Sequence, residues 1–404
     1  MVTTRLSEWR TSYSLSLDKD ALTVLQSRFG ATVAPSLRSD AETRWDVTPG
    51  STVGTVRRGV HQLVVLPKIP IGNVLYLLAV GSGQDPWSAA DDAALADAPD
   101  LTSGVVSLFT NLLNQAVTGG VLRGFRVAED DLHSVRGRID IARQLRQRPG
   151  LNLPLAVTYN EHDADILENR LLLAATRHLR QTEGLPRHLS QALGRAGRHF
   201  ADVEAVAYHA DDVPPVAWNL LNARYRSAVE LARLILRGTA VDIDAGSRAG
   251  HALTFDMNEV FEKFLVAAIG SALTHQDGRA QRQDTRWHLD EGRTIPLRPD
   301  LTWYGPDGTV RAVVDAKYKA ERSSGPVNAD VYQLLAYCTA TGLNDGHLVY
   351  AAGEQRPGQV RVIRGGPVIH AHAINLSGPP ADIARETTRV ARHIAQAASP
   401  AIAL

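Results

Sequence analysis

The sequence of 404 residues predicts a mixed α/β chain made of three parts. Residues 1–100 have mostly strand-forming composition, residues 101–250 have mostly the apolar spacing of amphipathic helices, and residues 251–404 alternate between helix and strand patterns. The acidic stretch 81–100, which contains Gly and Pro, and the turn-rich stretch 242–250 mark the two boundaries. The C-terminal order of helix, strands, helix and strand predicts a sheet covered by helices.

The N-terminal part is expected to be rich in strands. Residues 52–56 and 61–66 have strand composition on either side of a turn at Arg57-Arg58-Gly59, and residues 20–29 have the pattern of a short helix. Lys68 follows a proline at the end of the second strand. We interpret it as a solvated lysine at a turn, and contact with a partner is the alternative.

The middle part combines helical patterns with a modest basic stripe. Residues 217–237 are expected to form one long amphipathic helix. Between Arg123 and Arg148 the sequence has seven arginines and four acids. The arginines either contact DNA phosphates, which suit bidentate guanidinium groups, or pair with the acids of the stripe. A metal site at His162 is disfavoured, because no second histidine stands nearby at a spacing typical of metal ligands.

Composition and charge limit the classes of protein to consider. Hydrophobic residues make up 44% and charged residues 21%, as in an ordinary globular protein. The 43 basic and 43 acidic side chains give a formal net charge of zero, so contact with DNA would have to come from local patches. The single cysteine, Cys338, cannot form an internal disulfide, which is consistent with a reducing cytoplasm. The sequence has no Cys-His zinc pattern.

Targeting and nucleotide-binding signals are missing from the sequence. The N-terminal residues lack the apolar core of a signal peptide, and no apolar run approaches the roughly 20 residues that span a bilayer, so no membrane role is expected. No GxxxxGK[ST] motif occurs. If NTP hydrolysis drives the function, another subunit must supply it.

The most informative stretch is an expected β-hairpin with its turn at residues 305–308. If Tyr304 faces Thr309 across the turn, Asp300 lies opposite Val313. Side chains alternate along a strand, so Asp315 and Lys317 share the face of Val313. Asp300 and Asp315 then become diagonal neighbours roughly 7 to 8 Å apart, close enough for their carboxylates to hold one ion.

Two interpretations of this hairpin compete. In the first, the two carboxylates hold Mg²⁺, which also keeps waters and a substrate phosphate, and Lys317 positions the attacking water or neutralises the phosphate. In the second, Asp300 simply starts a strand while Asp315 and Lys317 form an exposed polar edge. The apolar run 312–314 before Asp315 opposes the second interpretation, because an unpaired carboxylate in a buried strand would be costly.

Neighbouring segments offer further side chains for the site. The expected helix 328–340 carries Gln333 and Tyr337 four residues apart on one face, with Asp330 three residues before Gln333 as another candidate metal ligand. The amphipathic helix expected at 257–273 carries Glu259 and Glu262, either of which would complete a metal sphere.

Several of these segments resemble a known family. Pro299-Asp300 followed by Asp315-Ala316-Lys317 resembles the PD-(D/E)xK nuclease signature, and Gln333 with Tyr337 resembles the additional motif of its RecB-like branch. The segments NEVFEKFL, DAKYK and DVYQLLAY resemble McrC, the nuclease subunit of modified-cytosine restriction systems. The resemblance is strong from Met257 onward and weaker before it, where it covers the strand ending in PKI and the segment RGRID.

The resemblance implies a restriction-endonuclease-like domain at residues 251–404 and a role for each candidate residue. Asp300 and Asp315 would hold Mg²⁺, and Mn²⁺ suits the same ligands. Glu262, chosen over Glu259 because it lies in the FEKF segment, would be a third ligand or a relay base. Lys317 would orient the attacking water, and Gln333 and Tyr337 would position the phosphate or brace Lys317. Lys319 would contact the DNA backbone.

The resemblance also implies partners. An McrB-like AAA+ ring, which binds GTP or ATP, would contact residues 1–100 and be stimulated by them, and the complex would cleave modified double-stranded DNA. Self-association within that complex is a further expectation. Two alternatives remain: a scaffold that activates an AAA+ ring without cutting DNA, and a stand-alone RecB-like nuclease. The large N-terminal region and the neutral charge disfavour the stand-alone nuclease.

Overall fold

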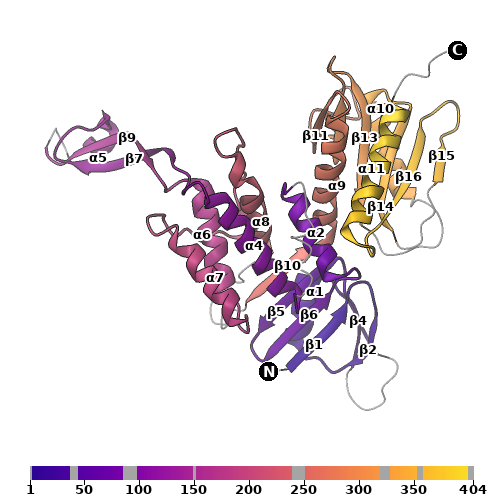
Figure 1. Cartoon of the computed structure of the whole chain (residues 1–404), viewed down its shortest axis with the longest axis horizontal. Coiled ribbons are helices and arrows are strands. Elements are labelled where there is room, and N and C mark those ends of the chain that lie inside the picture. Colours follow the sequence, from indigo (N-terminus) through magenta and orange to yellow (C-terminus); the bar gives the residue numbers. More distant parts are fainter. Residues whose placement is uncertain are drawn as a thin grey trace. The chain divides into compact units, whose positions relative to one another are not determined.

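The computed structural model describes residues 2–36, 44–84, 98–148, 152–238, 251–318, 328–352 and 358–398, and it is a mixed α/β structure (Figure 1). The chain divides into two compact units: Met1–Leu108 with Gly238–Leu404, and Phe109–Arg237. Lys319 and most of both expected boundary stretches lie outside the described residues. Among the helices that the structure describes, none is long and apolar enough to cross a membrane.

A four-stranded sheet in the first unit combines three N-terminal strands with a strand that follows the second unit in the sequence. Its order is β1 (Val2–Ser7), β6 (His61–Leu66), β5 (Thr52–Arg58) and β10 (Ala252–Asp256). At Gly54 φ is +129°, and a Cβ atom there would lie 2.1 Å from the carbonyl oxygen of Leu253, so β5 and β10 can pair only through glycine. The predicted segments 1–100 and 251–404 therefore share one sheet.

Smaller elements complete the N-terminal part. Helix α1 (Lys19–Phe29) starts at Asp18, whose side chain accepts a hydrogen bond from the amide of Ala21 at 2.8 Å. The strands β2 (Ser12–Leu15), β4 (Trp45–Thr48) and β3 (Thr32–Pro35) form a second sheet. Helix α2 (Ile71–Gly81) is buried over most of its length and packs against α9 (Met257–Thr274).

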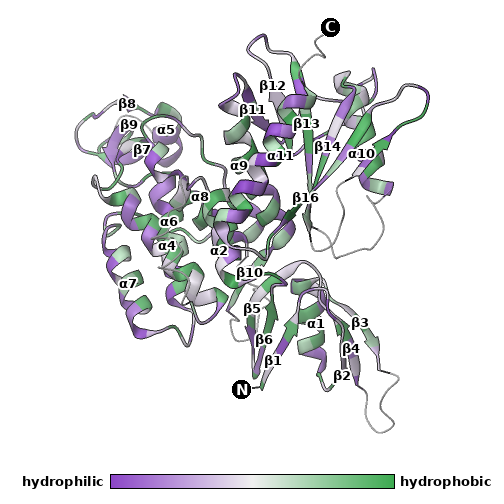
Figure 2. Ribbon diagram, turned by 45° about the vertical axis from the view of Figure 1, so that its right-hand side comes forward, coloured by the Kyte–Doolittle hydropathy of each residue, from purple (hydrophilic) through white to green (hydrophobic). Residues whose placement is uncertain are grey.

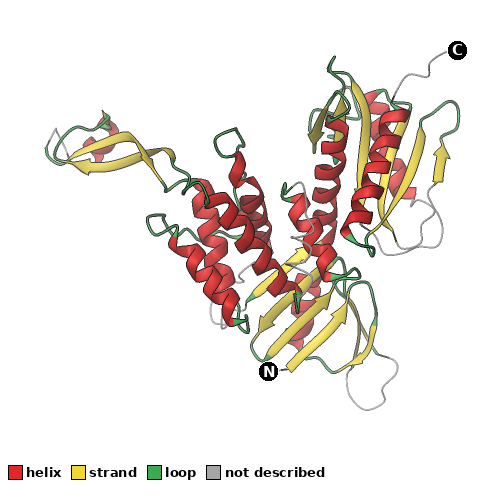
Figure 3. Ribbon diagram, in the orientation of Figure 1, coloured by secondary structure: helices red, strands yellow, loops and turns green. Residues whose placement is uncertain are grey.

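The second unit consists of helices and a β-arm. The helices are the C-terminal part of α4 (Leu101–Val117), α6 (Leu167–Arg180), α7 (Arg187–Arg198) and α8 (Arg226–Arg237), with short 3₁₀ turns at Ala210–Asp212 and Ala223–Tyr225. Figure 2 shows hydrophobic and hydrophilic residues on different sides of α7, as expected for a helix with one buried face. The arm consists of β7 (Gly124–Leu132), β8 (Arg138–Ile139), α5 (Ile141–Gln147) and β9 (Leu155–Asp163), and its two long strands extend from the helices (Figure 3).

The prediction of one helix over residues 217–237 is wrong in its first half. The amide of Asn219 donates to the side-chain oxygen of Asn222 at 2.8 Å, and the amide of Leu221 donates to the side-chain oxygen of Asn219 at 2.8 Å. These asparagine side chains compete with helical hydrogen bonds and hold a turn, so α8 begins only at Arg226.

Ion pairs within the arm involve several arginines of the basic stripe. Arg143 and Arg148 both pair with Asp131, at 2.9 and 3.0 Å, which confirms the interpretation that arginines of the stripe pair with its acids. Arg126 instead pairs with Asp163 on the opposite strand, at 2.9 Å. The arm therefore neutralises several of its own arginines.

A six-stranded sheet forms the C-terminal part of the first unit. Its order is β11 (Arg279–Arg282), β12 (Leu301–Tyr304), β13 (Val310–Lys317), β14 (Asp345–Ala352), β16 (Val368–Asn375) and β15 (Gly358–Arg361). Strands β13, β14 and β16 run parallel, and the pairs at each edge are antiparallel. The hairpin expected around residues 305–308 is the pair β12–β13.

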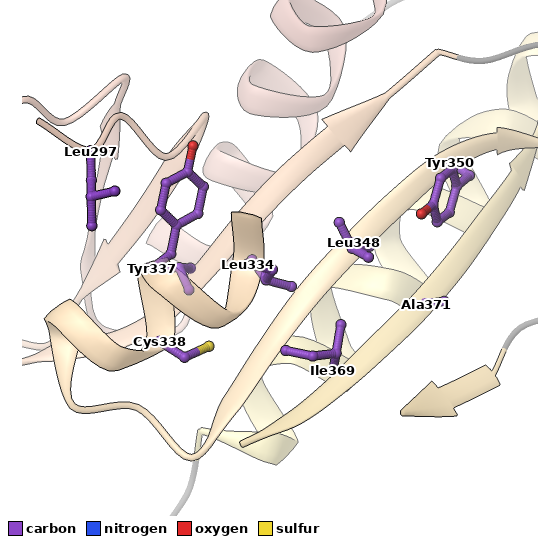
Figure 4. Packing of buried hydrophobic residues seen from close by; sticks show 9 residues of the cluster. Leu297, Leu334, Tyr337, Cys338, Leu348, Tyr350, Ile369 and Ala371 are labelled. Atoms are coloured by element: carbon purple, nitrogen blue, oxygen red, sulfur yellow. The ribbon is translucent and has the colours of Figure 1, made fainter. Parts of the chain in front are cut away.

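Helix α10 (Asn328–Thr341) covers one face of this sheet. Leu334 and Cys338 of α10 pack with Val313, Leu348 and Ile369 of the strands, and all five side chains are almost completely buried (Figure 4). Each of the four aliphatic side chains contributes roughly 1.5 to 3 kcal/mol through its burial. The helix comes this close because position 346 is glycine, where a Cβ atom would lie 2.6 Å from the Cys338 sulfur.

The remaining helices pack on the other face. A Cβ atom on Gly270 of α9 would lie 3.3 Å from the Cβ of Ala280 and 3.7 Å from the side chain of Leu301, so α9 lies against β11 and β12. Helix α11 (Pro380–Ala397) packs against α9 and β16. Because Asp315 is two residues beyond Val313 on β13, its side chain lies on the α10 face.

Candidate active site

The register of the β12–β13 hairpin differs from the expected one. Thr302, not Asp300, lies opposite Val313, and Leu301 lies opposite Val314. The difference has two parts: Tyr304 pairs with Val310 rather than Thr309, and an irregularity between Trp303 and Tyr304 skips one further residue of β13. A shift of two residues keeps each side chain on its face, so the same register carried one residue further places Asp300 directly opposite Asp315 rather than diagonal to it.

Asp300 is fixed by the backbone of β13 and surrounded by negative charge. Its Oδ2 accepts a hydrogen bond of 2.7 Å from the amide of Ala316. Burial and then the charges of Asp315 and Glu262 raise the pKa of Asp300 far above its usual range, more than the Ala316 amide and Lys317 lower it. The structure thus brings the predicted carboxylates of Asp315 and Glu262 close enough to Asp300 for their charges to raise its pKa.

Asp315 and Lys317 form a buried ion pair. The Asp315 side chain is only 1% exposed, and its Oδ2 pairs with Nζ of Lys317. Burial raises the pKa of Asp315 despite that pairing. Burial also opposes the charge on Lys317, yet the carboxylate of Asp315 outweighs it and raises the pKa of the ammonium group. Lys317 is therefore a charged donor at neutral pH.

Gln333 and Tyr337 hold Lys317 from α10. Nζ of Lys317 donates to Oε1 of Gln333 at 3.0 Å, and Nε2 of Gln333 donates to the Tyr337 hydroxyl at 2.7 Å. The Tyr337 hydroxyl in turn donates to the carbonyl oxygen of Arg298 at 3.1 Å, just before β12. This continuous chain of hydrogen bonds connects Lys317 to Gln333 directly and to Tyr337 through Gln333, and the bracing role expected for both residues stays a prediction.

Glu262 reaches the site from α9. Its Oε1 accepts a hydrogen bond of 2.6 Å from Nε2 of Gln283, whose own Oε1 accepts one from Arg298. Glu259 instead pairs with Lys263 at 3.0 Å. Of the two glutamates considered, Glu262 is the one whose charge raises the pKa of Asp300.

Two residues near the site were not among those given a role from the sequence. Asp330, 3% exposed, accepts a hydrogen bond from the Tyr350 hydroxyl at 3.0 Å, and its charge raises the pKa values of Asp315 and Lys317. Its place in the first turn of α10, three residues before Gln333, was the only signal in the sequence. Gln283 adopts a positive φ of 42° after β11, and no sequence pattern indicates its contact with Glu262.

The site offers carboxylate oxygens, which suit a hard cation, but its side chains do not form a complete set of metal ligands. Among the described residues, no group of three or more His, Cys, Asp or Glu side chains is placed so that it could hold a metal ion. Mg²⁺ needs only one or two carboxylates when waters and a substrate phosphate complete its sphere. Asp300 and Asp315 can provide that smaller set, and the metal role of Glu262 stays a prediction.

Comparisons with known proteins give the family. Residues 47–351 match the family model described as McrBC 5-methylcytosine restriction system component. Among solved structures, the chain is similar to one in an assembly of Thermococcus gammatolerans McrB AAA+ hexamers with bound McrC, with 19% identity, a TM-score of 0.54, and coverage of 96% of this chain and 100% of that one. A second similar chain comes from the cryo-EM structure of the Thermococcus gammatolerans McrBC complex, with 23% identity, a TM-score of 0.44, and coverage of 67% and 88%.

No curated protein matches the chain. At 19% identity, the likeness to the first solved structure shows a shared fold. The family model, in contrast, matches well over half of the sequence. The chain therefore belongs to the family of McrBC 5-methylcytosine restriction system components.

Proposed function

We propose that this chain is the DNA-cleaving subunit of a modification-dependent restriction complex, with a PD-(D/E)xK nuclease domain at residues 251–404. The observation that carries the proposal is the meeting of Asp300, Asp315 and the Lys317 ammonium group at the end of β13. Buried carboxylates with strongly perturbed pKa values are costly for a fold, and they gather where chemistry requires them.

The donor set supports Mg²⁺ as the cofactor. Asp300 and Asp315 would hold the ion, and Mn²⁺ would suit the same oxygens. When bound, such an ion lowers the pKa of a water molecule and offsets charge on the phosphodiester during its cleavage.

The chain's own residues would do the rest. Lys317, kept charged by Asp315 and held by Gln333, would orient the attacking water and neutralise the phosphate oxygen. Glu262, which accepts a hydrogen bond from Gln283, would accept the proton of that water as a relay base. Tyr337 would fix Gln333 and thereby the direction of the Lys317 side chain.

The function also requires a partner. The sequence has no phosphate-binding loop of the common NTPase type and a formal net charge of zero, so neither NTP hydrolysis nor general attraction to DNA is supplied by this chain. The similar chain of known structure comes from an assembly of McrB AAA+ hexamers with McrC. We infer that this chain binds an McrB-like ring, stimulates its GTP or ATP hydrolysis, and cuts modified double-stranded DNA within the complex.

The test compares cleavage and NTP turnover in the complex with the ring. Wild type, Asp315→Ala and the control Asp307→Ala are each purified with the McrB-like partner and supplied with Mg²⁺, NTP and methylated DNA. Asp307 suits the control, because it is an exposed acid in the turn of the same hairpin, where it accepts hydrogen bonds from Thr309. We expect Asp315→Ala to cut at least about 10³-fold more slowly, since a metal site supplies several kcal/mol of transition-state stabilisation. NTP turnover should stay near wild type in both variants.

A second candidate function is a scaffold that activates the ring without cutting DNA. The shared fold with a chain of an McrB–McrC assembly favours a role in assembly, whether or not the site is active. A wild-type complex that accelerates NTP turnover but leaves every modified DNA intact would establish this alternative and refute the nuclease assignment.

A further inference from the structure

Tyr318, the residue after Lys317, joins the end of β13 to the N-terminal sheet. Its side chain is 2% exposed, and its hydroxyl donates to Oε2 of Glu8 at 3.1 Å. Glu8 follows β1 and is itself 3% exposed, and its amide donates to the carbonyl oxygen of Leu66 in β6 at 2.9 Å. The contact therefore links residues 310 positions apart in the sequence.

Lys68 closes this junction from the segment after β6. Its amide donates to the same Oε2 of Glu8 at 3.1 Å, and its ammonium group lies 4.2 Å from the centre of the Tyr318 ring. Neither solvation nor partner contact, the two interpretations of Lys68 from the sequence, includes this contact with the nuclease strand.

The junction also reaches the helix that carries Glu262. The rings of Phe261 and Tyr318 lie 5.9 Å apart, and Phe261 is completely buried. Tyr318 thus packs against the neighbour of one candidate catalytic residue and directly follows another.

Because side chains alternate along a strand, these contacts restrict the backbone next to the candidate site. Lys317 points to the α10 face, where Asp315 and Gln333 hold its ammonium group. Tyr318 points to the other face, where Glu8, Lys68 and Phe261 hold its ring and hydroxyl. Two consecutive residues fixed on opposite faces leave the backbone between them little freedom to move.

We propose that Tyr318 is a positioning residue that locks the catalytic end of β13 to the N-terminal sheet through Glu8 and Lys68. The inference rests on the proposed nuclease function and adds to it a mechanical link between the two parts of the first unit. A polar junction is costly to bury, since burial raises the pKa of Glu8 above its usual range, so apolar packing alone would have served stability better.

The test uses the full-length chain in complex with the McrB-like partner and measures kcat and KM for DNA cleavage, NTP turnover and the melting temperature. The main variant is Tyr318→Phe, which removes only the hydroxyl. Tyr304→Phe is a matched control, because the buried Tyr304 hydroxyl likewise donates to a buried carboxylate, that of Asp284, at the far end of the same hairpin. Glu8→Gln is a rescue variant, since its amide oxygen can still accept from Tyr318 and Lys68.

We expect Tyr318→Phe to lower kcat for cleavage about 10- to 100-fold, the usual penalty for misplacing a catalytic group by up to ~1 Å, while KM changes less than about twofold. Glu8→Gln should cut within about threefold of wild type, and Tyr304→Phe should lose stability without losing kcat. NTP turnover should remain the same in Tyr318→Phe and Tyr304→Phe, which lie outside the part of the chain expected to stimulate the ring. A second variant, Lys68→Met, removes the cation over the ring, and we expect a smaller loss of kcat in the same direction.

Suppose that the wild-type complex cuts DNA and that Tyr318→Phe and Tyr304→Phe have equal kcat values. This result would overturn the positioning role and leave the nuclease assignment intact. If Tyr318→Phe and Tyr304→Phe lose kcat and melting temperature to the same extent, the loss of kcat reflects lost stability. That result would also overturn the positioning role. A wild-type complex that never cuts would overturn the proposed function and this inference together.

Discussion

Lowering the pH from 7.5 to 5 is expected to weaken the sheet around β14 and β16, because buried histidines meet there. Nδ1 of His347 and Nε2 of His372 lie 3.1 Å apart, and the rings of His370 and His393 stack or lie edge-on against them at 5.0 to 6.4 Å. Burial and the neighbouring imidazoles hold the pKa of His347 well below its usual range and lower that of His372 to about 3. Asp345, which pairs with His370, is the carboxylate at this cluster, and Arg389 adds positive charge.

The direction of the pH effect on stability depends on whether the folded or the unfolded state binds more protons. Between pH 7.5 and 5 the folded protein keeps His347 and His372 neutral, whereas the unfolded chain protonates them below a pKa of about 6.5. The unfolded state therefore binds more protons, and stability is lost as the pH falls. Each histidine held neutral costs about 2 kcal/mol at pH 5, so the pair costs about 4 kcal/mol. Asp300 and Asp315 act in the opposite direction over this range, because their raised pKa values make the folded state bind protons first.

A variant isolates the histidine contribution, since the opposing carboxylates cancel in the difference. His372→Gln removes one titrating ring and should reduce the pH-dependent loss by about 2 kcal/mol relative to wild type. The assay is hydrogen exchange read by mass spectrometry on peptides from β14 and β16, corrected for intrinsic exchange rates, at pH 7.5 and pH 5. His275→Asn, an exposed position in the same unit, is the control. An identical pH dependence in wild type and His372→Gln would refute the reasoning.

Three further predictions concern charge and packing. Asp300→Asn keeps an acceptor for the Ala316 amide while removing a crowded charge. In EDTA at pH 8 its melting temperature should therefore rise by a few °C, about 1 kcal/mol or more, and in the separate assay with Mg²⁺ it should lose cleavage. A lower melting temperature would contradict the charge argument. Asp165→Asn removes a carboxylate whose pKa is lowered to about 2, chiefly by its hydrogen bond from Arg170. Hydrogen exchange should therefore show that α6 opens more easily by about 1 to 2 kcal/mol at pH 7. The difference from wild type should vanish as the pH falls from about 4 to 2. Leu334→Ala leaves a cavity under α10 and should cost about 2 to 5 kcal/mol in thermal unfolding followed by circular dichroism.

Local periodicity was enough to predict the elements that carry the candidate site. The helices expected at 257–273 and 328–340 are α9 and α10, each one residue longer at its C-terminus. The common face of Asp300, Asp315 and Lys317 was also predictable, because alternation along a strand depends only on whether the number of residues is odd or even. The two-residue error in register preserved that parity and changed only which residues lie directly opposite.

Contacts between distant segments were not predictable in the same way. Gln283 reaches Glu262 only because the chain turns with a positive φ after β11, and no periodic pattern records such a turn. The pairing of β10 with β5 depends on a glycine at position 54 that looks ordinary in the sequence. The hydrogen bond between Tyr318 and Glu8 joins two residues that each lie at the end of a strand, and nothing in the sequence near either residue indicates the other.

The balance of charge at the site indicates that phosphate binding depends on an added cation. The raised pKa of Asp300 shows that Lys317, which already pairs with Asp315, does not offset the charges of Asp300, Asp315 and Glu262 together. A DNA phosphate would bring further negative charge to a place where burial has already raised the pKa values of two carboxyl groups. Lys317 alone therefore cannot accommodate the phosphate, and additional positive charge must arrive before or with the DNA. Binding of the scissile phosphate to this site should accordingly depend on a divalent cation even when no cleavage follows, as in a substrate with a phosphorothioate at the scissile position.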